Sequence, residues 1–176
     1  MSENAEYFIS HLINHEAPLP SPLERWPLHM TVVPPFHIED NLSEEMILKF
    51  MRVNGALIGP FTLSTEVDVH GSIPLLPGER DMYGEDRDIE VVKITDPTEL
   101  LHDLHKNLTH DLGRIGCSFI HLDPRWSGDN YHPHASTKSG DALRGPFFCN
   151  TLSLHKKSAG QKSIAGTVDM YNQVVL

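Results

Sequence analysis

The pattern of apolar and polar positions predicts seven strands and two helices. Short apolar runs, or apolar residues that alternate with polar ones, indicate strands where proline and glycine bound them. The second strand is expected to stop at Pro34-Pro35, because proline supplies no ladder donor and restricts the residue before it. The predicted strands cover residues 7–13, 28–33, 61–70, 89–94, 131–138, 147–155 and 163–171.

The helices are predicted from capping residues and from apolar residues at helical spacing. The first follows the capping hydroxyl of Ser43 and is expected to end at Asn54-Gly55. The second is expected to begin at 96–99, where an Asp, a Pro and a Glu have the order typical of a helix start. A leucine stripe predicts its buried face, and Gly113 or Gly116 its end.

Strands and helices occur in runs rather than in strict alternation, which favours an α+β fold. We expect one domain over residues 1–176, with two antiparallel sheets and the helices packed outside. The two halves of the chain have a similar order of elements. This similarity suggests an internal duplication.

Composition and charge limit the classes of function. With 14 basic and 24 acidic residues the net charge is -10, which argues against binding along the phosphates of long nucleic acid. No apolar run is long enough to span a membrane and no leader pattern is visible, so a cytoplasmic protein is expected. The two cysteines, Cys117 and Cys149, lack the spacing of a zinc site or a disulfide framework.

Two predicted strands share one short motif, a histidine followed two positions later by a hydroxyl residue. The first is His29-Met30-Thr31 and the second is His134-Ala135-Ser136. Side chains two positions apart on a strand point to the same face, roughly 6.5 to 7 Å from one another. If the two strands are neighbours, both imidazoles and both hydroxyls lie at one place.

Such a group of side chains has the chemistry to cleave a phosphodiester without a metal. One neutral imidazole takes a proton from the nucleophile, and the other, protonated, gives a proton to the departing oxygen. The hydroxyls hydrogen-bond the phosphate oxygens. Unperturbed histidine titrates near neutral pH, as both roles require.

The two motifs resemble those of the 2H phosphoesterase superfamily, which includes LigT-like 2′-5′ RNA ligases and cyclic phosphodiesterases. The matching segments are LHMTVVPPF around His29 and YHPHAST around His134, which lie 105 residues apart. The resemblance covers nearly the whole chain. It implies two lobes related by a pseudo-twofold axis around a central cleft, and metal-independent action on 2′-5′ or 2′,3′-cyclic phosphodiesters.

Further candidates for the site lie near the motifs. Lys138 is two positions beyond Ser136, so it shares the face of His134 and is predicted to bind phosphate. Where family members often carry an arginine a few positions beyond the second motif, this chain has Ser139. For stacking a base or holding a phosphate the candidates are Phe36, Trp126, Tyr131 and Arg125, each of which also suits the core or a loop. The segment 71–88 is expected to be a mobile surface loop that closes over the cleft or is a passive insertion.

The other histidines do not indicate a metal site. On the second helix His105 lies near the leucine face, His102 to one side and His110 almost opposite, so they cannot converge on one ion. No HExxH motif or Cys/His ligand set is present. No cofactor is expected.

The leading hypothesis is a monomeric, metal-independent phosphodiesterase with His29 and His134 as the acid and base, and Thr31 and Ser136 as phosphate anchors. Its expected partner is a nucleotide or an RNA end, without long nucleic acid or a membrane, and a reverse ligation remains open. The sequence does not assign which histidine is the base. The alternatives are a non-catalytic module that binds phosphorylated ligands and a metal-dependent hydrolase.

Overall fold

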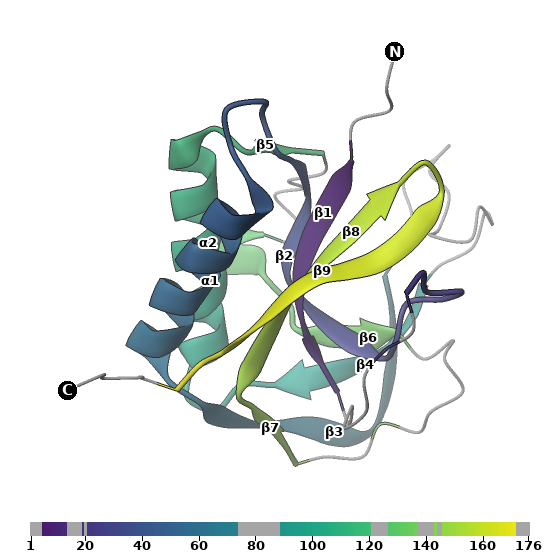
Figure 1. Cartoon of the computed structure of the whole chain (residues 1–176). Helices are drawn as coiled ribbons and strands as arrows, with labels where there is room; N and C mark the ends of the chain where they lie inside the picture. Colours follow the sequence, from purple (N-terminus) through teal and green to yellow (C-terminus); the bar gives the residue numbers. More distant parts are fainter. Residues whose placement is uncertain are drawn as a thin grey trace.

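A computed structural model of the chain shows a curved sheet of antiparallel strands with two helices side by side on one face (Figure 1). It describes residues 5–13, 19, 21–73, 89–120, 127–136, 143 and 146–171, with the backbone alone at 66–73, 89–90 and 136. The helices are α1 (Glu44–Ile58) and α2 (Leu100–Ile115), with a short 3-10 helix at Gly128–Asn130. The strands are β1 (Glu6–Leu12), β2 (His29–His37), β3 (Phe61–Ile73), β4 (Ile89–Thr95), β5 (Ser118–Phe119), β6 (His134–Ser136), β7 (Phe147–Cys149), β8 (Thr151–Ser158) and β9 (Gln161–Asp169).

The strands follow one hydrogen-bonded order, β9, β8, β1, β2, β6, β4, β3 and β7, and the short β5 pairs with β2. Every one of these pairs is antiparallel. The predicted α+β class, antiparallel strands and external helices are confirmed. The two expected sheets continue into one another through the β2–β6 pair, and the pseudo-twofold relation between the halves stays a prediction.

Helix α1 begins as predicted and ends later. Ser43 is its N-cap, but the helix continues through Asn54-Gly55 to Ile58 and is closed by Gly59 at φ 75°. The prediction of an end at Gly55 was wrong because this glycine serves packing. A Cβ at Gly55 would lie 3.2 Å from Cγ of Met170, so a small residue is needed where α1 meets the end of the sheet.

Helix α2 begins at Leu100, four residues after its predicted cap. The carboxylate of Asp96 nevertheless accepts hydrogen bonds from the backbone N–H of Leu101 (2.7 Å) and of His102 (3.4 Å). Asp96 therefore caps the first turn from a distance, and the residues between form a tight turn with Glu99 at φ 60°. The predicted end is confirmed at Gly116, whose φ is 105°.

Strand β2 does not stop at the two prolines. At Phe36-His37 it pairs with β5, and the carbonyl of Pro35 accepts a hydrogen bond from the N–H of Ile120 (2.9 Å). The register between β1 and β2 shifts next to this segment, so the ladder does not require a backbone N–H from either proline. In the same way 147–155 was predicted as one strand but is divided into β7 and β8, and β5 was not predicted.

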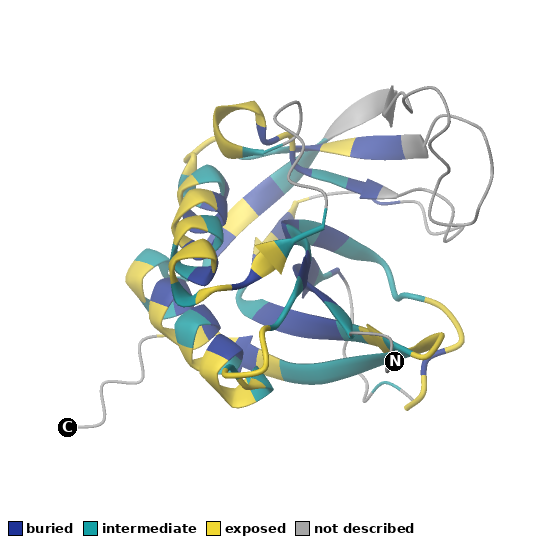
Figure 2. Cartoon of the chain, turned by 90° about the horizontal axis from the view of Figure 1, so that it is seen from above, coloured by how far each residue is buried: buried dark blue, intermediate teal, exposed yellow. Residues whose placement is uncertain are grey.

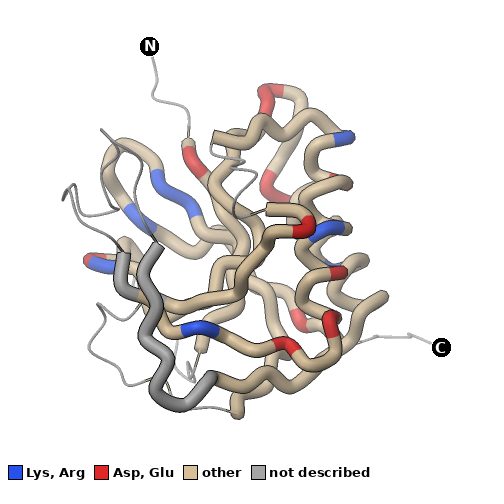
Figure 3. The backbone as a smooth tube through the Cα atoms, turned by 180° about the vertical axis from the view of Figure 1, so that it is seen from behind, with Lys and Arg blue, Asp and Glu red and all other residues tan. Residues whose placement is uncertain are grey.

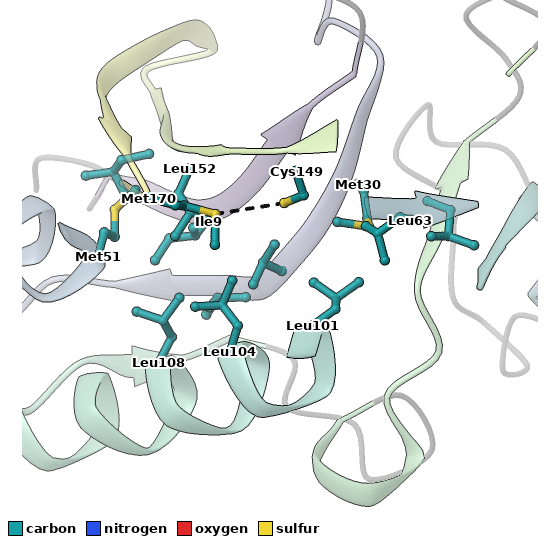
Figure 4. Packing of buried hydrophobic residues seen from close by; sticks show 14 of the residues in the cluster. Ile9, Met30, Met51, Leu63, Leu101, Leu104, Leu108, Cys149, Leu152 and Met170 are labelled. Atoms are coloured by element: carbon teal, nitrogen blue, oxygen red, sulfur yellow. Dashed lines mark hydrogen bonds between the residues drawn. The ribbon is translucent and has the colours of Figure 1, made fainter. Parts of the chain in front are cut away.

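The hydrophobic core lies between the helices and the sheet (Figure 2). Leu101, Leu104 and Leu108 of α2 point toward the strands (Figure 4), as the leucine stripe predicts. Cys149 and Met170 meet in this core at 4.0 Å. Both cysteines are free and buried. No helix in the part of the chain that the structure describes has the length and apolar character needed to cross a membrane.

Candidate active site

The two histidine motifs lie side by side at the centre of the sheet, on β2 and β6. Met30 and Ala135, the middle residues of the motifs, are register partners. Both side chains are buried in the core between the sheet and the helices. Because side chains alternate along a strand, the first and third residues of each motif lie on the opposite face of the sheet.

This pairing brings the motif histidines to one place. In an antiparallel pair, the register at Met30 sets Thr31 opposite His134 and His29 opposite position 136. The two histidines are therefore diagonal neighbours on the face turned away from the helices. Each histidine lies beside the hydroxyl residue of the other motif.

Both imidazoles are oriented by the same kind of hydrogen bond. Nδ1–H of His29 donates to the carbonyl oxygen of Pro27 (2.7 Å), and Nδ1–H of His134 donates to that of His132 (2.8 Å). A carbonyl only accepts, so each neutral ring carries its proton on Nδ1. Nε2 is then the unprotonated nitrogen of both rings, which is the state needed to take a proton or, after protonation, to give one.

The surroundings lower the pKa of both histidines. Burial is the main cause of the lowered pKa of His29, and it outweighs the opposing hydrogen bond to Pro27; the nearby His134 adds a smaller lowering effect. Burial also lowers the pKa of His134, and it outweighs the opposing hydrogen bond to the carbonyl of His132. In the free protein both rings are therefore neutral at pH 7. A bound phosphate anion would favour the protonated form of a neighbouring ring and raise its pKa.

An aromatic wall, formed by Phe8, Trp26 and His155, stands beside His29. The His155 ring stacks on Phe8 (4.1 Å between centroids) and lies 5.4 Å from the ring of His29. Trp26 meets both Phe8 and His155 edge to face at 5.1 Å. Nε2 of His155 hydrogen-bonds to Ser10 Oγ (2.5 Å). Burial lowers the pKa of His155 to about 2, so it is a neutral support for His29 and not a proton donor.

A buried network behind β2 fixes the first motif. Nδ1–H of His105 donates to the carbonyl of Val32 (2.7 Å), and its Nε2 accepts from the N–H of Gly128 (3.1 Å). The His105 ring also stacks on Tyr131 (4.1 Å), whose hydroxyl donates to the carbonyl of Thr31 (2.7 Å). Side chains from α2 and from the segment before β6 thus hold the backbone that carries the first motif.

Removal of the Tyr131 hydroxyl is expected to destabilise the protein. In Tyr131→Phe the carbonyl of Thr31, a half-buried residue, loses this donor, which lowers the free energy of unfolding by about 1–3 kcal/mol. Urea denaturation measures the change. Tyr171→Phe, at a tyrosine that is 52% exposed, is the control and should leave stability unaltered. Equal stability of Tyr131→Phe and the wild type would show that this hydrogen bond does not support the site.

The other predicted site residues have different placements. Phe36 has no exposed surface and packs in the core against Tyr7 and Phe119, so the structure does not bring it to the histidines. Tyr131 is likewise buried and supports the site from behind. For Ser136 only the backbone is described. Lys138, Arg125, Trp126 and the loop residues 74–88 lie outside the described residues, while 71–73 belong to β3.

The sequence prediction missed the aromatic wall and the supporting role of His105. Phe8 on β1 and His155 on β8 lie on the same face of the sheet as His29. The alternation of side chains along each strand could have suggested this placement. Their meeting depends on the β1–β8 register, Phe8 opposite His155, which only the fold supplies. Over the described ranges no group of three or more His, Cys, Asp or Glu side chains could hold a metal ion.

Solved structures with the same fold are found by comparison. A crystal structure of a phosphoesterase superposes with a TM-score of 0.50 at 16% identity over 96% of this chain and 99% of that one. The protein TT0787 of Thermus thermophilus gives a TM-score of 0.53 at 12% identity over 96% and 99%. E. coli LigT complexed with NADP+ gives 0.49 at 16% identity over 97% and 99%.

Sequence comparisons give no such match. No protein-family model matches the chain, and no curated protein matches it. The resemblance expected from the two motifs is thus confirmed for the fold, which this chain shares with solved structures over nearly its whole length.

Proposed function

We propose that this chain, which has the fold of the phosphoesterase structures above, is a phosphodiesterase that uses two histidines and no metal. The proposed substrate is a 2′,3′-cyclic or 2′-5′ phosphodiester of a nucleotide or of an RNA end. The net charge of -10 favours a short ligand over long RNA. We further propose that the protein acts as a monomer in the cytoplasm.

One observation carries this proposal. His29 and His134 lie on one face of the β2–β6 pair, and each donates its Nδ1–H to the carbonyl two residues before it. Two imidazoles that are held in the same way, each with an unprotonated Nε2, can act on opposite sides of one phosphorus. A surface histidine with a purely structural role has no need of a partner held in the same way.

The chemistry follows from this geometry. A water molecule attacks the phosphorus of the cyclic diester, and Nε2 of the neutral histidine takes its proton. The bond from phosphorus to one ribose oxygen breaks, and the protonated histidine gives its Nε2 proton to that oxygen. The product is a phosphomonoester, and the two histidines have exchanged protonation states. Thr31 would hydrogen-bond a non-bridging oxygen, on which negative charge accumulates.

We expect the profile of kcat/KM against pH to be a bell centred below pH 6.5. This profile reports the free protein. Since both histidine pKa values are lowered from 6.5, the base stays neutral to a lower pH and the acid loses its proton at a lower pH. The profile of kcat should lie at higher pH, because the bound anion raises both values.

Stopped assays over about pH 4.5 to 9 measure both profiles. Circular dichroism at each pH is needed as a control, since protonation of the buried His155 would destabilise the fold in acid. A kcat/KM optimum well above pH 7 would contradict the assignment of these two histidines.

The proposed activity is tested on a small panel of substrates. The panel contains 2′,3′-cyclic mononucleotides and a 2′-5′-linked dinucleotide, and each reaction contains excess chelator. Turnover of one member supports the two-histidine mechanism. Activity that appears only after a divalent metal is added would indicate metal-dependent hydrolysis. Binding of a nucleotide without turnover at any pH would indicate a recognition module.

A further inference from the structure

Lys93 on β4 is the direct register partner of His134 on β6. The adjacent N–H of Ile94 donates to the carbonyl of Pro133 (2.9 Å), which extends this register beyond the end of β6. Residues directly opposite each other in an antiparallel pair share a face, with Cβ atoms about 4.5–5.5 Å apart. The side chain of Lys93 therefore projects from the sheet beside His134, one of the two proposed acid/base groups.

The alternation of β4 gives the same placement independently. Val92 and Ile94, the neighbours of Lys93, are buried in the core. Lys93 must then lie on the opposite face, where it is exposed. Residues that lie opposite one another on successive strands form a row across the sheet. This row runs from Lys93 to His134, then to Thr31, and on to Ser10, the partner of Thr31 on β1.

The surroundings of Lys93 leave its charge available. Within the described part of the chain, no carboxylate pairs with its ammonium group, whereas Lys106 and Lys156 form ion pairs with Asp129 and Glu44. Other lysines and arginines lie on both helices and on the β8–β9 hairpin (Figure 3), where Nζ of Lys162 is 5.8 Å from the centre of the Trp26 ring. In a chain of net charge -10, a phosphodiester needs a local cation on this face.

We propose that Lys93 is a substrate-binding residue that donates a charge-assisted hydrogen bond to a non-bridging phosphate oxygen next to His134. This inference rests on the proposed function for its substrate and goes beyond it in assigning the cation of the site. The flexible stem of lysine suits a point contact with one oxygen. A phosphate bound there also lies close enough to His134 to favour its protonated form.

The test compares Lys93→Gln and Lys93→Arg with the wild type. Lys49→Gln is the matched control, since Lys49 is an exposed lysine on α1, on the other side of the sheet. Lys93→Gln should raise KM for the active panel member about ten- to a hundredfold. Lys93→Arg should restore most of the binding, and Lys49→Gln should behave as the wild type. The dependence of kcat/KM on ionic strength should weaken in Lys93→Gln alone.

A second measurement separates this proposal from the proposed activity. Binding of inorganic phosphate is followed by calorimetry for the wild type and for Lys93→Gln. Turnover with an unchanged KM in Lys93→Gln would overturn the role of Lys93 and leave the phosphodiesterase standing. If no substrate is turned over, binding that is at least tenfold weaker in Lys93→Gln supports Lys93 as a phosphate ligand. Equal binding by both proteins, or none by either, overturns it.

Discussion

Replacement of His29 or of His134 by alanine is expected to lower kcat by about 10²- to 10⁴-fold, the usual contribution of a positioned general acid or base. Each variant removes one of the two proton-transfer groups that one phosphodiester would need. The remaining histidine cannot serve on both sides of the phosphorus. The rates are measured at saturating substrate on the panel member that the wild type hydrolyses.

The stability of these variants is expected to stay near that of the wild type. Both histidines lie on the face away from the core, and within the described residues the hydrogen bond of each goes to a carbonyl two residues away. His110→Ala is the matched control, because this side chain is 69% exposed on α2. Full activity of either motif variant, or equal loss in His110→Ala, would refute the pairing of the two histidines.

Replacement of His105 by leucine is expected to cause the largest loss of stability. The imidazole satisfies two backbone groups, the carbonyl of Val32 and the N–H of Gly128. Leucine has a similar size but no polar atom, so both groups lose their partner. The carbonyl of Val32 is buried, so the loss of its donor should lower the free energy of unfolding by about 1–3 kcal/mol. The N–H of Gly128 adds less, because Gly128 is exposed and water can replace the imidazole there.

Urea denaturation of His105→Leu and of His110→Leu gives the comparison. Both substitutions are on α2, but His105 is buried and His110 is exposed. His105→Gln is a second control, since an amide donates and accepts and should recover part of the loss. A change below about 0.5 kcal/mol in His105→Leu, the range of ordinary surface substitutions, would show that His105 is no anchor of β2.

The sequence predicted those parts of the fold that depend on local pattern. The leucine stripe of α2 gave its buried face, and the same geometry placed His105 on that face and His110 opposite, as is found. The motif pattern gave the two faces of β2 and β6. In each case a period of two or of 3.6 residues decides where a side chain points.

Other features depend on contacts between distant parts of the chain and could not be predicted. The pairing of Met30 with Ala135 sets the site, but nothing within either motif specifies its partner. Gly55 looked like a helix end because its close contact with Met170 was unknown. The sequence around Lys93 contains no motif that indicates a binding residue, and only the β4–β6 register places Lys93 beside His134.

The most direct test of the account is a nitrogen NMR titration of His29 and His134, with and without inorganic phosphate. We predict that both neutral rings carry the proton on Nδ1, that both pKa values lie below 6.5, and that phosphate raises both. Assignments come from the His29→Ala and His134→Ala variants. A proton on Nε2 of either neutral ring, or a phosphate response of only one histidine, would contradict the claim that the two imidazoles act together on one phosphodiester.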